Sequence, residues 1–290
     1  MIAFVFPGQG SQRRGMGGAL FDEVSEYAKV ERDVDATVGY SLRRLCLEDP
    51  DNRLKQTQFT QPCLYMVNAL HYYKAIASGT RPAFVAGHSL GEYNALHAAG
   101  VFDLLTGLRL VKRRGELMAE ARNGGMGAVI GLSADAVSRV ILDNRLTTLE
   151  VANLNTPLQT VVSGAVADVT RAGPLFQQAG AQNYVPLPVS AAFHSRYMAE
   201  AGNAFAAFLA PMAFAAPQIP VVANATAQLY PTQDPSNSVK SLLTTQITHA
   251  LRWTESIQFL LDRGVTRFDE IGPGNVLTRM VQQIQQYVGA

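Results

Sequence analysis

A serine between two glycines is the feature of this sequence with the clearest chemical meaning. Residues 87–91 are Gly-His-Ser-Leu-Gly, which matches the G-x-S-x-G pattern of serine nucleophiles. A short apolar run, Ala83 to Ala86, precedes the pattern, and a helix from Leu90 to Ala99 is expected after it. A strand, a sharp turn and a helix are the setting in which such a serine is exposed. The pattern predicts a nucleophilic Ser89, and the alternative is a glycine-rich turn with a helix-capping serine.

A serine attacks well only when a base accepts its proton, and histidine is the usual base because its pKa lies near working pH. The chain has five histidines. His71 and His97 fall inside predicted helices and are expected to be structural, and His88 adjoins the serine with its side chain directed away. His194 follows a predicted strand, in a loop of the kind where catalytic groups usually lie, so it is the favoured base. His249 is the alternative, and no Asp or Glu stands out as a third member.

A positive charge lies on the apolar face of a predicted helix. When residues 104–121 are placed on a helical wheel, apolar side chains gather on one arc and most charged side chains on the opposite side. Arg114 is the exception, because it falls near the middle of the apolar arc. A buried guanidinium needs a carboxylate, which it can bind through two parallel hydrogen bonds. The sequence leaves two sources open, namely an Asp or Glu of the core and the carboxylate of a substrate.

A second glycine-containing turn, Gly8-Gln9-Gly10, follows the first predicted strand. Backbone N–H groups at such a turn could complete an oxyanion hole with the N–H that follows Ser89. The G-x-G-x-x-G pattern of dinucleotide sites fails because residue 13 is arginine, and no P-loop lysine follows. The turn therefore favours anion stabilisation and excludes a dinucleotide site.

The elements that would position these residues alternate between strands and helices. Ile2 to Phe6 and Ala83 to Ala86 are short apolar runs typical of buried strands, and Thr60 to Ala77 has helical character. This alternation predicts an α/β fold with a mostly parallel sheet. Further strands are expected at 219–222 and 268–271, and further helices at 199–208 and 254–263.

The middle of the chain has a different order of elements, strand–helix–strand–strand–helix–strand, which is that of a ferredoxin-like unit. Pro174 predicts a kink or break in the second helix of this unit. We predict a large domain of residues 1–124 and 197–290, with an inserted ferredoxin-like subdomain at 125–196. The strands of the unit are expected at 126–132, 149–154, 159–163 and 183–189, and its helices at 135–143 and 166–179.

Composition limits the class of protein. The 290 residues include 24 basic and 23 acidic side chains, and this near balance gives no support for nucleic-acid binding. The two cysteines, Cys46 and Cys63, have neither disulfide nor metal-type spacing and are expected to be buried free thiols. The run from Ile2 to Phe6 is too short for a signal segment, and no apolar stretch approaches the roughly 18 residues of a membrane span. We expect a cytoplasmic monomer that binds neither metal nor membrane.

Taken together, these segments resemble the malonyl-CoA:acyl carrier protein transacylase family. Residues 39–43 through 57–62 are also similar to the free-standing acyltransferases that serve polyketide synthase modules in trans. The resemblance implies an α/β-hydrolase-like core with an inserted ferredoxin-like subdomain, in agreement with the order of elements above. The residues that match the family occur in order across nearly the whole chain, at 6–12, 87–92, 114–115, 193–194, 246 and 272–274.

The resemblance implies a role for each matching residue of the site. Ser89 would be acylated by malonyl-CoA, His194 would be the base, and Arg114 would bind the free carboxylate of malonyl. The main-chain carbonyl of Gln246 would orient His194 in place of an acid. Two pairs complete the site: the N–H groups of Gln9 and Leu90 as the oxyanion hole, and Phe193 and Met118 as determinants of acyl selectivity.

The activity implied is malonyl transfer from malonyl-CoA to the phosphopantetheine thiol of an acyl carrier protein, through malonyl-Ser89 in a ping-pong reaction, with no bound cofactor. A supply of polyketide modules in trans is favoured over a housekeeping role in fatty-acid synthesis. An acyl hydrolase that clears carrier proteins is a further alternative, although such relatives tend to lose the arginine that Arg114 matches. A non-catalytic docking module is disfavoured by the presence of Ser89, His194 and Arg114 together.

Overall fold

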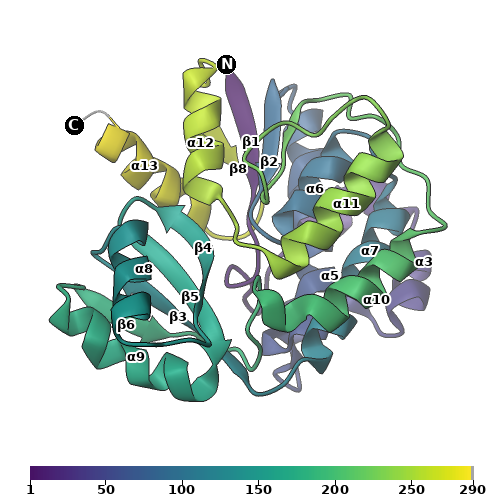
Figure 1. Ribbon diagram of the computed structural model, residues 1–290. Coiled ribbons are helices and arrows are strands. Elements are labelled where there is room, and N and C mark those ends of the chain that lie inside the picture. Colours follow the sequence, from purple (N-terminus) through teal and green to yellow (C-terminus); the bar gives the residue numbers. More distant parts are fainter. Residues whose placement is uncertain (289–290) are drawn as a thin grey trace.

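Two β-sheets organise the chain in the computed structural model, which describes residues 1–288 (Figure 1). The first sheet has the order β7-β2-β1-β8, and every neighbouring pair is parallel. Ile2 pairs with Arg267 in this sheet, so the two ends of the chain meet in it. The predicted parallel α/β core is confirmed. Its strands are β1 (Ile2–Phe6), β2 (Phe84–Gly87), β7 (Val221–Val222) and β8 (Arg267–Glu270).

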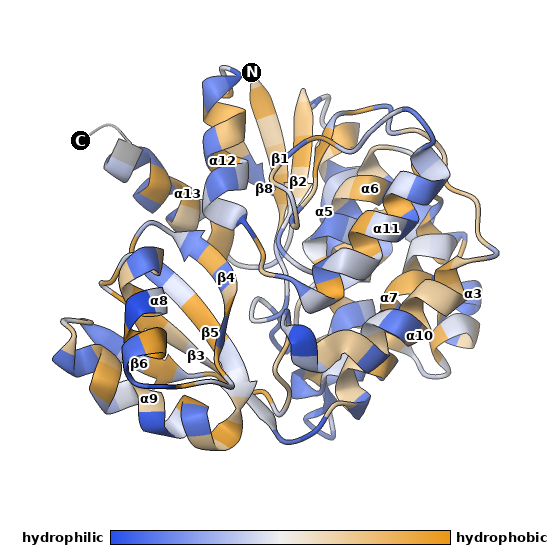
Figure 2. Cartoon of the chain, in the orientation of Figure 1, coloured by the Kyte–Doolittle hydropathy of each residue, from blue (hydrophilic) through white to orange (hydrophobic). Residues whose placement is uncertain are grey.

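Side chains of β1 alternate between the two faces of the parallel sheet, as an extended backbone requires. Phe4 and Phe6 join the large core on one face, whereas Ala3 and Val5 join a smaller core on the other. Figure 2 shows the apolar strands β1 and β2 lying between layers of helices. The large core is covered by α5 (Thr57–Ala77), α6 (Gly91–Ala98), α7 (Leu104–Glu120), α10 (Ala199–Leu209) and α11 (Pro235–Thr248), and the smaller one by α12 (Trp253–Asp262) and α13 (Val276–Val288).

The second sheet is antiparallel and comes from the middle of the chain. Its order is β4-β5-β3-β6, and it confirms the predicted ferredoxin-like succession of elements. A separate apolar core, which includes Val129, Val137 and Phe176, joins this sheet to its two helices. In Figure 1 the unit forms the teal lobe beside the parallel sheet. Its elements are β3 (Gly124–Ile130), α8 (Ala134–Asp143), β4 (Glu150–Thr156), β5 (Gln159–Ala165), α9 (Val166–Gln178) and β6 (Asn183–Pro186).

Of the kink or break expected at Pro174, the break is absent. Pro174 lies inside α9, which runs from Val166 to Gln178 without the predicted break. The ring of a proline disfavours helical geometry by clashing with the side chain of the preceding residue. That residue here is Gly173, which has no Cβ, so the helix continues through the proline.

Several strand boundaries differ from the predicted ones by a few residues. The strand expected at 219–222 contains only Val221–Val222, and the late strand is displaced to Arg267–Glu270. Cys46 and Cys63 are buried and free, as predicted. No helix among residues 1–288 combines the length and the apolar character that crossing a membrane demands. The remaining helices are α1 (Leu20–Glu23), α2 (Ser25–Ala28), α3 (Glu31–Val38), α4 (Leu42–Glu48), η1 (Arg53–Lys55) and η2 (Arg196–Met198).

Candidate active site

Ser89 stands in a sharp turn between β2 and α6. Its backbone has a φ of 51°, a left-handed conformation that is strained for a residue with a side chain. The flanking glycines are required by space, because a Cβ on Gly91 would lie 2.0 Å from the carbonyl oxygen of Phe6. Asn224 holds the turn from the side, since its Oδ1 accepts from the N–H of Ser89 at 2.8 Å and its Nδ2 donates to Gly87 O at 2.6 Å. The turn is thus a strand-to-helix elbow that exposes the serine.

His194 faces this serine. Its Nε2 lies 2.9 Å from Ser89 Oγ, and its Nδ1 lies 2.7 Å from the main-chain oxygen of Gln246. A carbonyl oxygen can only accept, so Nδ1 carries the proton and Nε2 is free to accept the proton of the serine. The carbonyl of Gln246 stands where an acid stands in a catalytic triad.

The other histidines do not reach the serine. His249, the alternative base, is exposed, and its Nδ1 contacts Thr248 Oγ1 and Thr245 O. His88 turns its Nε2 to Asn155 Oδ1 at 2.9 Å, and His97 contacts the hydroxyl of Tyr73.

The environment of His194 keeps its imidazole neutral. Burial lowers the pKa of His194 from its ordinary 6.5 to about 3, and the positive charge of Arg114 acts in the same direction. The hydrogen bond to the carbonyl of Gln246 opposes this shift. A neutral histidine in contact with a serine hydroxyl is the form that a general base requires.

Arg114 is buried beside the serine, as its position on the helical wheel predicts, with 1% of its surface exposed. Its Nη2 donates to Ser89 Oγ at 3.0 Å and to Gln246 Oε1 at 2.9 Å, and its guanidinium lies over the ring of Tyr93. Its Nε has no hydrogen-bond partner. Within residues 1–288, no Asp or Glu forms a salt bridge with Arg114. The guanidinium is therefore a buried cation beside the serine, with an unused hydrogen-bond donor at Nε.

The N–H groups of Gln9 and Leu90 lie on the two turns that meet at the site. The Gly8 turn packs tightly on the elbow, because a Cβ on Gly8 would lie 2.4 Å from the carbonyl oxygen of His88. Gln9 and Leu90 both line the cavity above Ser89. Across residues 1–288, neither N–H donates to a backbone carbonyl. Two free backbone N–H groups beside a serine hydroxyl are the donors from which an oxyanion hole is built.

The cavity above Ser89 lies between the two sheets and has a volume of about 100 Å³. This is well below the ~300–1,000 Å³ of pockets that hold drug-sized ligands, so it suits a small acyl group. Its walls come from the elbow, from α7 and from the antiparallel sheet. They include Gln61, Ser89, Arg114, Met118, Met126, Asn153, Val161, Phe193 and His194.

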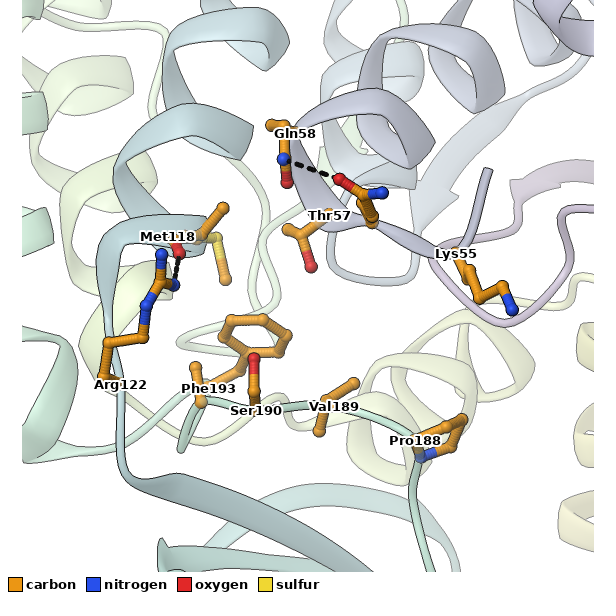
Figure 3. Close-up of a pocket in the computed structure, with 12 residues that line it drawn as sticks. Lys55, Thr57, Gln58, Met118, Arg122, Pro188, Val189, Ser190 and Phe193 are labelled. Atoms are coloured by element: carbon orange, nitrogen blue, oxygen red, sulfur yellow. Dashed lines mark hydrogen bonds between the residues drawn. The ribbon is translucent and has the colours of Figure 1, made fainter. Parts of the chain in front are cut away.

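A wider vestibule of about 260 Å³ adjoins this cavity and shares Met118, Val189 and Phe193 with it. Figure 3 shows the vestibule with Thr57 and Gln58 on one side and Val189 and Ser190 on the other. Met118 and Phe193 line both spaces, so they stand between the serine and the outer opening. They therefore form the boundary between the vestibule and the cavity above Ser89, which is named the acyl cavity below.

The chain is similar to known proteins over almost its whole length. Residues 3–287 match the acyl transferase domain family. The chain belongs to this family. It is an acyltransferase, and the elbow, the histidine and the buried arginine lie within the matched region.

Its relatives include proteins named as malonyl CoA-acyl carrier protein transacylases. BaeC of Bacillus velezensis, a polyketide biosynthesis malonyl CoA-acyl carrier protein transacylase, is 49% identical over 289 residues, which cover 98% of this chain and 97% of that protein. The malonyl CoA-acyl carrier protein transacylase of Escherichia coli K12 is 38% identical over 291 residues, or 98% of this chain and 92% of that protein. A solved complex of a type II polyketide synthase acyl carrier protein with its malonyl-transacylase (PlMCAT:AntF) has a TM-score of 0.92 and 34% identity, covering 98% of this chain and 93% of that chain.

The acyltransferase site contains residues that the sequence reasoning missed. Glu92 is fully buried one turn after the serine, and Tyr230 and Asn224 donate to it. A signal for Glu92 was present, because the residues three and four positions later, Ala95 and Leu96, are apolar and share its helix face. Asn224 gave no signal, since it lies 135 residues from the serine that it holds.

The described residues of the acyltransferase also contain no group of three or more His, Cys, Asp or Glu side chains placed to hold a metal ion.

Proposed function

We propose that this acyltransferase moves a malonyl group from malonyl-CoA to the phosphopantetheine thiol of an acyl carrier protein, through malonyl-Ser89. One observation carries the proposal. The guanidinium of Arg114, which is buried and forms no salt bridge with an acidic side chain among residues 1–288, lies 3.0 Å from the hydroxyl oxygen of Ser89 in a cavity of about 100 Å³. Such a cation favours an acyl group that ends in a carboxylate, because arginine binds carboxylates through two parallel hydrogen bonds.

In the first half-reaction, Ser89 Oγ attacks the thioester carbonyl while its proton passes to His194 Nε2. The negative charge that develops on the carbonyl oxygen is stabilised by the N–H groups of Gln9 and Leu90. The carbon–sulfur bond then breaks, and the sulfur of CoA leaves as a thiol after taking the proton from His194. The serine carries a malonyl ester, whose free carboxylate binds Arg114.

In the second half-reaction, the thiol of the phosphopantetheine arm gives its proton to His194 and attacks the ester carbonyl. The bond between Ser89 Oγ and the acyl carbon breaks, and the serine recovers the proton from His194. Atoms and charges balance over the cycle without any redox partner. The vestibule next to the cavity would hold the thiol arm, and Lys55 and Arg122 among its lining residues would suit a phosphate.

A role in polyketide synthesis, with the enzyme acting in trans, is favoured by the greater identity to BaeC, 49%, than to the Escherichia coli enzyme, 38%. The alternatives are a housekeeping enzyme of fatty-acid synthesis and a hydrolase that clears acyl groups from carrier proteins. The buried Arg114 disfavours the hydrolase, since an enzyme that clears varied acyl chains gains nothing from a cation in the cavity. The domain limits 1–124 with 197–290 and 125–196, a monomeric state and a cytoplasmic location stay predictions.

The proposed transfer is tested with malonyl-CoA and holo carrier proteins from a polyketide and a fatty-acid pathway, with the apo carriers as the matched control. We expect malonyl-carrier protein to form with the holo forms and not with the apo forms, at a higher rate with the polyketide carrier. Free malonate released without carrier acylation would replace the transferase by the hydrolase. Equal rates with both carriers would remove the polyketide preference.

A further inference from the structure

A buried carboxylate stands behind the catalytic residues and has no part in the steps above. Glu92 lies in the first turn of α6 and has no exposed surface. Its side chain is directed into the protein, where it contacts Tyr230, Asn224 and Gln246. A carboxylate buried this completely is costly unless its oxygens are well satisfied. The groups that form hydrogen bonds with the Glu92 carboxylate therefore indicate its role.

The side-chain oxygens of Glu92 act as acceptors in each hydrogen bond that they make among the described residues. Oε1 accepts from the hydroxyl of Tyr230 and from the N–H of Asn224, and Oε2 accepts from Nε2 of Gln246. An ionised carboxylate accepts hydrogen bonds on both oxygens. A protonated carboxyl group also carries an O–H, which would need an acceptor of its own. Burial raises the pKa of Glu92 from 4.5 to about 7, whereas these hydrogen bonds and the charge of Arg114 oppose the rise. The ionised form that fits this geometry is thus readily lost to protonation near neutral pH.

Gln246 connects this carboxylate to the site through both halves of its amide. Its Nε2 donates to Glu92 and, at 2.8 Å, to the main-chain oxygen of Ser89. Its Oε1 accepts from Arg114, and its own main-chain oxygen accepts from His194. The nitrogen and oxygen of an amide are similar in size, so the amide orientation is set by its partners. A reversed amide would turn a donor toward Arg114 and an acceptor toward two acceptors.

From this arrangement, and on the basis of the proposed malonyl transfer, we infer that Glu92 is a positioning residue. Its ionised carboxylate fixes the side chain of Gln246 in the one orientation that holds Arg114 beside the serine while the main chain of the same residue holds His194. The base and the carboxylate-binding cation are thereby aligned by a single residue, and Glu92 sets the orientation of that residue. The carboxylate of Glu92 makes no hydrogen bond to Ser89 Oγ, whose partners are His194 and Arg114.

The substitution Glu92→Gln tests this with almost no change in shape. The new amide cannot accept from Tyr230, Asn224 and Gln246 together, because one of its ends is a donor. We expect kcat/KM for acylation of Ser89 by malonyl-CoA to fall by about tenfold or more, as for loss of a hydrogen bond to a buried charge. Acylation by acetyl-CoA, which needs no cation, should fall less. Equal losses for both acyl groups, or no loss, would overturn the inference.

The pH profile gives a readout that a purely structural role would not change. The groups that face Glu92 are Tyr230, Tyr93 from its own helix and Arg114 from α7, and burial raises the pKa of both tyrosines far above neutral pH. Of the groups named here, Glu92 is the one whose pKa lies near neutral pH, at about 7. We expect kcat/KM of the wild-type enzyme to decline below pH about 7 and the Glu92→Gln variant to be flat there. The same decline in both proteins would contradict the inference.

Two more variants cover the case in which Glu92→Gln does not fold. Tyr230→Phe removes one hydrogen bond that lowers the pKa of Glu92, so the acidic limb should move to higher pH with the catalytic residues intact. An unmoved limb would overturn the inference.

Glu270→Gln is the matched control, since the carboxylate of Glu270 accepts hydrogen bonds from the first turn of α13. It should lower stability and leave the acylation profile unchanged, and a changed profile would show that any such substitution perturbs the site. Absence of acylation in the wild-type enzyme would refute the proposed function instead.

Discussion

Arg114 donates from Nη2 to the Oγ of Ser89 across 3.0 Å, and that oxygen also lies 2.9 Å from Nε2 of His194. In the free enzyme the hydroxyl oxygen of Ser89 is therefore placed between a cation and a neutral imidazole. The cation contributes to the low pKa of the base, since a positive neighbour disfavours a second positive charge. Under the proposed function, the carboxylate of the acyl group would neutralise the cation, so the same arrangement would both select the substrate and adjust the base.

Replacement of Arg114 tests this selection. In Arg114→Ala, loss of a buried charge-assisted contact should lower kcat/KM for malonyl-CoA by at least about tenfold. Acylation by acetyl-CoA should rise relative to malonyl-CoA, because the cavity loses its cation. The rates are measured by stopped-flow or quenched formation of the acyl-enzyme.

The neighbouring Arg113 supplies the matched control, because it is partly exposed and pairs with Glu116. Arg113→Ala should keep the malonyl preference of the wild-type enzyme. If Arg114→Ala also keeps it, the arginine has a structural role alone.

The low pKa of His194 has a consequence for stability. The unfolded chain binds a proton on this histidine below pH about 6.5, whereas the folded protein leaves it neutral down to about 3. The unfolded state thus binds more protons, and the contribution of His194 to the free energy of unfolding falls as pH falls from about 6.5 toward 3. We expect His194→Gln to lose less stability than the wild-type protein between pH 7.5 and 5, as measured by urea unfolding.

His249→Gln is the control for this comparison, since His249 is exposed. It should lose stability with falling pH as the wild-type protein does. Glu92 has the opposite effect on the pH dependence of stability, because its raised pKa makes the folded protein bind a proton at a higher pH than the unfolded chain. This contribution is the same in the wild-type protein and in both variants. Identical pH dependence in His194→Gln and the wild-type protein would contradict a neutral, buried base.

Phe193 and Met118 are expected to limit the acyl group by volume, because they line both the acyl cavity and the vestibule. Phe193→Ser should enlarge the cavity and raise the ratio of methylmalonyl to malonyl acylation by about tenfold, the scale of one added methyl group in a pocket. The ratio is measured by competition between the two CoA esters, with Met118→Leu as a control of nearly constant volume. An unchanged ratio would place the selectivity elsewhere.

Periodicity made part of this site predictable. Arg114 was found because a charge on the apolar arc of a helix is conspicuous, and the elbow because strand, glycines and helix adjoin in sequence. A similar pattern surrounds Glu92, but it was not recognised, and its meaning depends on partners that only the fold assembles. Asn224 and the side chain of Gln246 reach Ser89 from 135 and 157 residues away, and such hydrogen bonds leave no local pattern. The predicted break at Pro174 failed for a local reason, the absence of a side chain on Gly173.

The proposed transfer requires a malonyl ester on Ser89, and intact-mass spectrometry of the enzyme mixed with malonyl-CoA in the absence of carrier protein detects that ester. The account predicts one added malonyl group on the wild-type protein, located on the peptide that contains Ser89, and none on Ser89→Ala. Addition of holo carrier protein should remove the group from the enzyme. An adduct of equal extent on Ser89→Ala, or none on the wild-type protein, would contradict the account.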